Sequence, residues 1–236
     1  MGVISHDQAY DIQHQMVTAR LAGAVPVGFK AGLTSLAAQQ RFSVSEPVAG
    51  VLMPGGRVDS PVKLSGFKHP MMELELGFVM ASPITAPVRD VSALSALVAA
   101  VFPVIELPDL AFADIGSLSG IDIVASNVAS HSWLQGDARS PALFDLNAIP
   151  VTLSRNDVLL LSSRSDDVMG SQWLALQWLI NRTLANGWTL EAGQLLITGA
   201  IGRMLPAEPG TYRADFGPLG SVVYEMQVGS LDLKQP

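Results

Sequence analysis

Hydrophobic and polar residues follow two different periods along this chain, and the two periods predict a mixture of helices and strands. Apolar residues recur at helical spacing from Ser5 to Leu21, where Ser5 can act as the N-cap and Gly23 as the stop. A second long helix is predicted from Ser171 to Asn186. Its expected core-facing residues keep helical spacing: Trp173, Leu176, Ile180 and Leu184.

Strand-like patterns are more numerous than helical ones. The apolar stretch 71–80 predicts a buried strand, and the alternation in residues 151–153 and 158–161 around Asn156-Asp157 predicts a hairpin. Further elements are predicted as follows: a strand over residues 25–32, a helix over 35–42 that Thr34 caps, a strand over 50–53, a helix over 91–101 that Asp90 caps, a strand over 103–107, a loop-rich stretch over 114–136, and strands and turns within 194–199 and 210–227. Few long helices and many strands predict an α+β fold rather than a doubly wound sheet.

The composition fits one sizeable domain. A chain of 236 residues is long enough to bury a substantial core. We expect a helical N-terminal segment over residues 1–45 packed on the core, a catalytic domain over 46–228 and a tail over 229–236. Because 49% of the residues are apolar and only 15% are charged, we expect a homo-oligomer to cover part of the apolar surface.

Charge and cysteine content exclude several classes of partner and site. The net charge of −7 comes without a basic cluster, which argues against nucleic acid as a partner. The absence of cysteine excludes disulfides, thiolate nucleophiles and zinc–thiolate sites. The amino terminus lacks a secretory pattern, and the longest apolar run, residues 96–105, is shorter than a membrane span. We therefore expect a cytoplasmic protein with no membrane partner.

Three glutamates form the leading candidate site. Residues i and i+2 of a strand share a face, so Glu73 and Glu75 are predicted to point in the same direction, while Glu106 lies on another predicted strand. A solvated acidic face is the plain alternative, because charged residues are mostly exposed. In an apolar strand, however, paired carboxylates are costly unless a cation neutralises them. The pattern therefore predicts a divalent metal site with oxygen ligands.

Several segments follow one another in a specific order. Residues 28–35 read GFKAGLTS, residues 73–79 read ELELGFV, and the segments 190–200 and 209–222 close the chain. These segments resemble the G-x-K-x-G-L-T-S, E-x-E-x-A-F-V, G-D-x-I-L-T-G, P-G-D and G-L-G-S-V motifs of the fumarylacetoacetate hydrolase superfamily. Within it they resemble the branch of 2-oxopent-4-enoate (2-hydroxypentadienoate) hydratases and 4-oxalocrotonate decarboxylases, over almost the whole chain.

The resemblance implies a fold, a cofactor and a set of site residues. The fold is a mixed β-roll of the fumarylacetoacetate hydrolase C-terminal-domain type, in an oligomer. The cofactor is Mg²⁺ or Mn²⁺, held by Glu73, Glu75 and Glu106 with positions left open for water and substrate. Lys30 is expected to hold the substrate carboxylate or enolate oxygen; a surface lysine at a strand end is the alternative. Further substrate-binding residues are expected at the matching positions: Leu33, Thr34, Ser35, Asn127 and Thr198.

The chain departs from this family where the family carries acids. The family has an aspartate shortly after the glycine that corresponds to Gly50, but this chain has Met53-Pro54-Gly55-Gly56 there. A second aspartate, in an A-D-N triplet, is replaced by Ser126. The family's small-residue stretch before a G-x-P motif is replaced by residues 165–172. The usual general acid and base are therefore missing.

Three other residues are candidates for the lost proton transfer. Asp166 is one substitute acid, with a helix-capping role as the alternative. His69 and His131 are candidates because histidine titrates near neutrality, with a local hydrogen-bonding role as the alternative. We assign a catalytic role to Lys30 together with these three residues.

These features together predict a divalent-metal-dependent lyase of aromatic-compound catabolism. It is expected to add water to a small 2-hydroxy-2,4-dienoate or 2-oxo acid. Decarboxylation of the 4-oxalocrotonate type, or carbon–carbon hydrolysis of an acylpyruvate, is the alternative at the same site. The non-enzymatic alternative is a partner subunit of reduced activity, in complex with a related hydratase or decarboxylase subunit.

Overall fold

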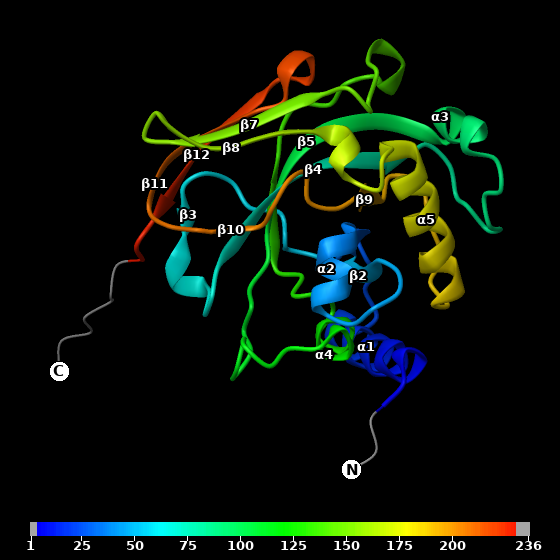
Figure 1. The fold of residues 1–236 in the computed structure, drawn as a ribbon. Coiled ribbons are helices and arrows are strands. Elements are labelled where there is room, and N and C mark those ends of the chain that lie inside the picture. Colours follow the sequence, from blue (N-terminus) through cyan, green and yellow to red (C-terminus); the bar gives the residue numbers. More distant parts are fainter. Residues whose placement is uncertain (1–3, 230–236) are drawn as a thin grey trace.

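Two mixed β-sheets and a small set of helices form an α+β fold (Figure 1). The computed structural model describes residues 4–229, so the expected tail over 229–236 lies outside the described residues except for Gly229. No helix in the described range is long and apolar enough to cross a membrane. The prediction of an α+β fold is confirmed.

The larger sheet has its two longest strands at the centre. β4 (Met71–Met80) pairs antiparallel with β5 (Val98–Leu107) on one side and with β9 (Leu195–Ile197) on the other. The remaining strands complete this sheet: β1 (Gly28–Gly32) and β2 (Val48–Leu52) beyond β9, β6 (Ser132–Gln135) beyond β5, and β10 (Leu205–Pro206) beside β4. Most residues of β4 and β5 are buried, so polar groups on them lie in the protein interior.

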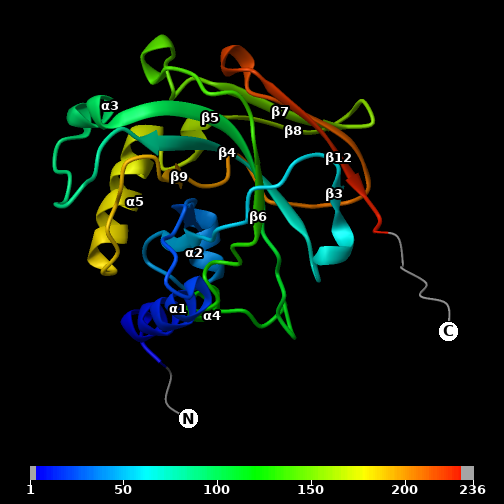
Figure 2. The ribbon, with the colours of Figure 1, turned by 180° about the vertical axis from the view of Figure 1, so that it is seen from behind.

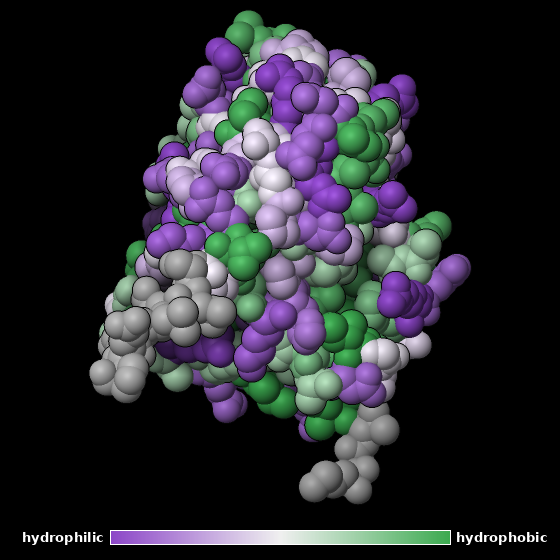
Figure 3. All heavy atoms as spheres, turned by 90° about the vertical axis from the view of Figure 1, so that its left-hand side faces the viewer, coloured by the Kyte–Doolittle hydropathy of each residue, from purple (hydrophilic) through white to green (hydrophobic). Residues whose placement is uncertain are grey.

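The smaller sheet contains the predicted hairpin. Its strand order is β3 (Val62–Lys63), β12 (Ser221–Gln227), β11 (Gly210–Asp215), β7 (Pro150–Arg155) and β8 (Val158–Arg164). Asn156 and Asp157 join β7 to β8 with φ of 49° and 65°, the positive values that a type I′ turn requires. Figure 3 views the side of the molecule where β11 and β12 lie, and shows a largely polar surface with separate hydrophobic patches.

The helices lie around the larger sheet. Figures 1 and 2 place α1 (His6–Leu21), α2 (Leu36–Arg41) and α4 (Gly120–Ala125) together near the N-terminal end. α5 (Gln172–Ala185) packs on β1, β2 and β9, with Leu176 and Ile180 fully buried as expected. The remaining helical segments are short: α3 (Leu94–Leu97) and 3₁₀ turns over Leu64–Gly66, Val91–Ala93, Pro141–Leu143, Ser165–Asp167 and Gly217–Leu219.

The structure corrects three local predictions. The helix expected over 91–101 ends at Leu97, because residues from Val98 onward pair with β4 and this tertiary pairing overrides helical spacing. The loop-rich stretch 114–136 contains α4 and β6. The N-cap of α2 is Ser35, whose hydroxyl accepts the Ala38 N–H, and this leaves Thr34 free for another role. The division at residue 45 stays a prediction, although β1 is an inner strand of the larger sheet.

The buried side chain of Gln13 fastens α1 to the rest of the protein. Its Nε2 donates to the backbone oxygens of Ala49 at 3.0 Å and Val124 at 2.8 Å, which belong to β2 and α4. Ser5 caps the same helix through a capping box with Gln8, as its sequence predicts. The Val124 carbonyl also accepts the Asn127 N–H at 3.0 Å, so the Ala49 carbonyl depends more on this amide.

We expect Gln13→Leu to lower the free energy of unfolding by about 1–3 kcal/mol, because it removes two buried hydrogen bonds and the donor of the Ala49 carbonyl. Gln15→Leu, on the exposed face of the same helix, is the matched control and should change it by less than about 0.5 kcal/mol. Urea unfolding followed by circular dichroism measures both. Equal effects of the two substitutions would contradict the role of Gln13.

Candidate metal centre

The register between β4 and β5 brings the three glutamates together. Glu73 lies directly opposite Glu106, and Glu75 follows two residues later on the same face of β4. One carboxylate oxygen from each of the three lies within 4.8 Å of the others. The predicted convergence of Glu73, Glu75 and Glu106 is therefore present in the fold.

The triad contains buried acceptors without donors. Glu75 and Glu106 are 0% and 1% exposed. Oε2 of Glu75 accepts the backbone N–H of Gly199 at 2.6 Å, but its Oε1 and the Oε2 of Glu106 have no hydrogen-bond partner among residues 4–229. Orphaned carboxylate oxygens in the interior are costly unless a cation binds them. This donor set, three carboxylates and no nitrogen or sulfur, fits Mg²⁺ or Mn²⁺.

Lys30 supplies one positive charge to the same face of the sheet. It lies opposite Ile197 of β9, which in turn lies opposite Gly77 of β4. The side chain is 2% exposed, its Nζ forms an ion pair with Glu106, and it also donates to the Val128 carbonyl at 3.2 Å. Lys30 is therefore a buried, fixed cation and not a surface lysine.

The charges of this cluster shift one another's pKa values. The pKa of Glu73 is raised to about 7. Burial is the largest cause, Lys30 lowers the pKa, and the negative charge of Glu106 raises it. Burial, followed by Glu106 and Glu73, also raises the pKa of Glu75 well above its ordinary value. Burial by itself lowers the pKa of Lys30, but the negative charges of Glu106, Glu73 and Glu75 outweigh it, so the pKa is raised and the ammonium stays charged. The raised pKa values show that Lys30 alone does not offset the cost of ionising all three carboxylates, so a bound cation would favour their charged forms.

A cavity of about 400 Å³ opens beside this cluster. Lys30 and Glu73 line it, together with Leu33, Thr34 and Ser35, which are three of the predicted substrate-binding residues. Most of the remaining wall is apolar and includes Leu110, Ile115, Leu118, Ile123 and Val128. The arrangement offers polar groups at one place and a hydrophobic lining for a carbon chain.

Asn127 and Thr198 are not among the residues that line this cavity, and a substrate-binding role for them stays a prediction. The amide of Asn127 is occupied by Val51: its Oδ1 accepts the Val51 N–H at 2.7 Å and its Nδ2 donates to the Val51 carbonyl at 2.9 Å. Thr198 is fully buried, and its hydroxyl lies 2.6 Å from Oε1 of Gln172. The side chains of both residues therefore form hydrogen bonds within the protein interior.

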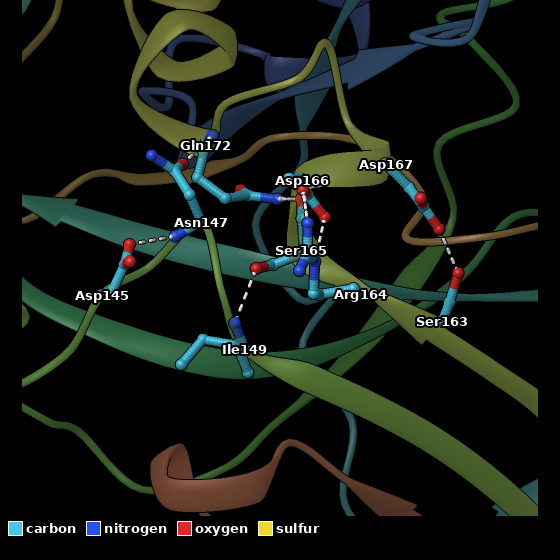
Figure 4. A network of polar contacts seen from close by, with 9 residues as sticks. All are labelled: Asp145, Asn147, Ile149, Ser163, Arg164, Ser165, Asp166, Asp167 and Gln172. Atoms are coloured by element: carbon cyan, nitrogen blue, oxygen red, sulfur yellow. Dashed lines mark hydrogen bonds and ion pairs between the residues drawn. The ribbon is translucent and has the colours of Figure 1, made fainter.

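Gln172 braces the segment that holds Glu75. Its Nε2 donates to the Ser165 carbonyl at 2.7 Å, and its Oε1 accepts from Thr198, the residue before Gly199 (Figure 4 shows Gln172 and Ser165). Gly199 has a φ of 112°, and a Cβ there would lie 2.5 Å from the Thr34 methyl group. Glycine is therefore needed where the backbone donates to Glu75.

The three candidate proton carriers are not among the residues that line the cavity, and their catalytic roles stay predictions. His69 is exposed, and its backbone N–H donates to Asp109. His131 stacks on Phe67 with ring centroids 4.1 Å apart. Asp166 pairs with Arg164 at the β8–α5 corner, as Figure 4 shows, and this pairing lowers the pKa of Asp166. For His131 and Asp166 these side-chain contacts agree with the alternative of a local structural role.

Two backbone groups of the site were missed by the sequence analysis. The Gly199 N–H binds Glu75, and the Val128 carbonyl binds Lys30. A glycine after a buried strand was a usable signal for the first. The second depends on consecutive left-handed residues, Asn127, Val128 and Ala129, with φ of 63°, 54° and 52°. Valine gives no sequence signal for that conformation, which is rare for β-branched residues.

Comparisons with known proteins agree with this geometry. No family model matches the chain. A 2-keto-4-pentenoate hydratase from Paraburkholderia xenovorans (strain LB400) is 30% identical over 232 residues, which cover 96% of this chain and 86% of the relative. The chain belongs to the 2-keto-4-pentenoate hydratase family. Other curated relatives of this hydratase-family chain include a 4-oxalocrotonate decarboxylase from Pseudomonas sp. (strain CF600), 29% identical and covering 86% of this chain and 78% of the relative.

Solved structures extend the comparison to the fold. The structure of 4-oxalocrotonate decarboxylase from Pseudomonas putida G7, complexed with magnesium and adipate, matches with a TM-score of 0.88 at 27% identity, covering 95% of this chain and 87% of that one. Fumarylpyruvate hydrolase from Pseudomonas aeruginosa, in complex with Mn²⁺ and pyruvate, shares the fold at 13% identity and a TM-score of 0.66, covering 85% and 89%. The hydratase-family chain thus has the fold of the fumarylacetoacetate hydrolase superfamily, as its motifs predicted.

Adding Mg²⁺ or Mn²⁺ to EDTA-treated protein is expected to raise its melting temperature, because an ion that binds only the folded state stabilises it by about 2.7 kcal/mol at 100 times Kd. Glu75→Gln should remove most of this rise. Glu191→Gln, an exposed glutamate away from the triad, should retain it. Thermal unfolding with each metal and with EDTA measures the effect; a wild-type melting temperature that ignores all three additions would refute the metal site.

The metal-free protein should lose stability as the pH rises. The pKa of Glu73 is about 7 in the folded protein and 4.5 as its ordinary value, so between these values the folded state binds more protons than the unfolded state. This contribution is present below pH 4.5 and is lost as the pH rises through 7. In EDTA we expect a fall on the order of 2 kcal/mol from pH 5 to pH 8, which Glu73→Gln should reduce. Urea titrations at both pH values measure it, and a slope unchanged by Glu73→Gln would speak against the prediction.

Proposed function

We propose that this protein is a divalent-metal-dependent lyase that hydrates a small 2-hydroxy-2,4-dienoate or 2-oxo acid. One observation carries the proposal: three converging carboxylates with orphaned oxygens lie beside a fixed lysine at one wall of an apolar cavity. Membership of the 2-keto-4-pentenoate hydratase family supports the same reaction class. Magnesium and manganese in the related structures support the choice of ion.

Each group of the site has a definite task in this proposal. Glu73, Glu75 and Glu106 hold Mg²⁺ or Mn²⁺, which when bound supplies Lewis-acid polarisation of a 2-oxo acid. The ammonium of Lys30 attracts the substrate carboxylate or the oxygen that gains charge. Leu33, Thr34 and Ser35 form the adjacent wall and position the substrate. The apolar lining holds the carbon chain and keeps water away from it.

The same structure leaves the delivery of water without a dedicated carrier. The turn after β2 that replaces the family's aspartate is closed by a Gly56 N–H bond to the Met53 carbonyl and carries no acid. The hydroxyl of Ser126 donates a hydrogen bond to the Ile123 carbonyl at 2.9 Å. Apart from two arginines, Lys30 and Glu73 are the titratable residues that line the cavity within the described range. The hydration step is therefore expected to be the weakest part of the chemistry.

Decarboxylation of the 4-oxalocrotonate type is the second candidate, because loss of carbon dioxide does not require a positioned water. The TM-score of 0.88 to a 4-oxalocrotonate decarboxylase favours it specifically. Carbon–carbon hydrolysis of an acylpyruvate shares the need for water with hydration. A partner subunit of reduced activity, joined to a related hydratase or decarboxylase subunit, is the non-enzymatic candidate.

We also propose that the protein forms a homo-oligomer. Val158 and Leu159 on β8 and Val223 on β12 are 63%, 62% and 57% exposed, which is unusual for large apolar side chains. Covering them would lower the apolar surface facing water. In this proposal the 2-oxo acid is the small-molecule substrate, and a second copy of the same chain is the protein partner. A cytoplasmic location stays a prediction from the sequence.

Enolisation should outrun hydration in this protein. In deuterium oxide, 2-oxopentanoate is expected to exchange its C3 protons in a reaction that needs Mg²⁺ and is abolished by Glu75→Gln but kept by Glu191→Gln. Hydration of 2-hydroxypenta-2,4-dienoate should lag, since loss of one positioned acid or base costs about 10²–10⁴ in rate. Proton NMR follows the exchange, and dienol absorbance with product mass follows hydration.

The remaining outcomes separate the candidates. Release of carbon dioxide from 4-oxalocrotonate at a rate well above hydration would identify the decarboxylase. Fast stoichiometric hydration would show that a proton carrier is present after all. Neither exchange nor turnover with metal bound would favour the partner subunit.

A further inference from the structure

The charges that line the cavity differ in sign from those of the whole protein. The chain carries 14 basic and 21 acidic side chains. Within the described residues, however, Lys30, Arg41 and Arg203 line the cavity, whereas Glu73 is its one acidic lining residue. Such a concentration of positive charge in an acidic protein marks a place for an anion.

Arg203 sits on a short loop that is fastened on both sides of Glu73. Before the arginine, the Ile201 N–H donates to the Leu74 carbonyl at 2.8 Å. After it, Leu205 of β10 pairs with Met72 of β4. The loop that carries Arg203 is therefore attached to β4 at both of its ends, next to the cavity.

Arg41 is placed by a different element, the last turn of α2. Its guanidinium carbon lies 5.2 Å from the ring centroid of Phe42, which also lines the cavity. Stacking of this kind orients a guanidinium while leaving its N–H groups free. Five other arginines of the described range form ion pairs with carboxylates, but Arg41 and Arg203 form none there.

We propose that the cavity takes a 2-oxo acid that carries a second carboxylate, and that Arg41 and Arg203 select for that second carboxylate. This inference rests on the proposed function and names its substrate class, a 2-oxo dicarboxylate. Lys30 and a bound divalent cation together neutralise Glu73, Glu75 and Glu106, so these groups need no help from the arginines. The two guanidinium groups are then free for the substrate, and neither is paired with the triad.

The apolar part of the cavity wall suits the carbon chain of such a molecule. Leu33, Ile115, Leu118, Ile123 and Val128 line the cavity and offer no hydrogen bonds from their side chains. A carbon chain fits this surface, whereas a polar chain would lose its hydration there. Polar ends and an apolar middle are the shape of a dicarboxylic acid.

Matched pairs of acids test the inference by binding, independently of turnover. Isothermal titration calorimetry in Mg²⁺ compares 2-oxoglutarate, 2-oxoadipate and 2-oxopimelate with the monoacids of equal length, 2-oxopentanoate, 2-oxohexanoate and 2-oxoheptanoate. We expect the diacid of at least one pair to bind about tenfold more tightly, as charge-assisted hydrogen bonds to guanidinium provide, and the preference to shrink with added salt.

The preference should fall to about twofold or less in the double variant Arg41→Gln/Arg203→Gln. Affinity for the monoacid should be kept, which shows that the variant is folded and the metal end intact. Arg89→Gln is the matched control, an exposed arginine that forms no ion pair within residues 4–229 and does not line the cavity; it should bind like wild type. Full retention of the diacid preference in the double variant would overturn the inference.

Two other outcomes separate this inference from the proposed function. Magnesium-dependent binding of both acids with equal affinity in every pair, or tighter binding of the monoacids, would overturn the selection by Arg41 and Arg203 and leave the 2-oxo acid site standing. Failure of every 2-oxo acid to bind in a magnesium-dependent way would overturn both.

Discussion

The pairing of β4 with β5 is the constraint on which the rest of the site depends. It sets Glu73 opposite Glu106 inside a buried sheet, with Glu75 on the same face. Three carboxylates so close together repel one another and are poorly solvated, as the raised pKa values of Glu73 and Glu75 reflect. The fold can hold this arrangement only with positive charge nearby, so Lys30 and a divalent cation are part of the same structural requirement.

A further set of contacts fixes Glu75, which forms no ion pair among the described residues. Glu75 is held by the Gly199 N–H, and the segment before it is held by Thr198 against Gln172, which is tied in turn to Ser165. The same glycine touches Thr34 of the cavity wall. Gly199 thus lies between Glu75, a predicted metal ligand, and Thr34, which lines the cavity. Contacts of this kind around a metal ligand commonly tune metal affinity.

The sequence predicted what local patterns encode. The i, i+2 spacing of Glu73 and Glu75 and the strand propensity of their neighbours gave the triad, and capping residues gave both long helices. It was less successful where tertiary pairing decides, as at Val98–Val101, which helical spacing assigned to a helix and pairing with β4 makes a strand. It could not give the partner of Asn127, because residue type shows that an amide can form hydrogen bonds but not that Val51 of β2 accepts and donates them.

The remaining question is why no histidine or aspartate is found among the described residues that line the cavity. Such a side chain needs a hydrogen-bond partner or solvent, and the apolar part of the lining, which includes Leu33, Ile115 and Val128, offers no partner. The ring of His131 and the carboxylate of Asp166 form hydrogen bonds with Ser132 and Arg164 instead. What the cavity retains is the triad with Lys30, which can withdraw electrons from a substrate once a metal is bound, and the positive charge of the two arginines. Those features favour loss of carbon dioxide, and enolisation in which solvent takes the C3 proton, over reactions that need a protein base to position water.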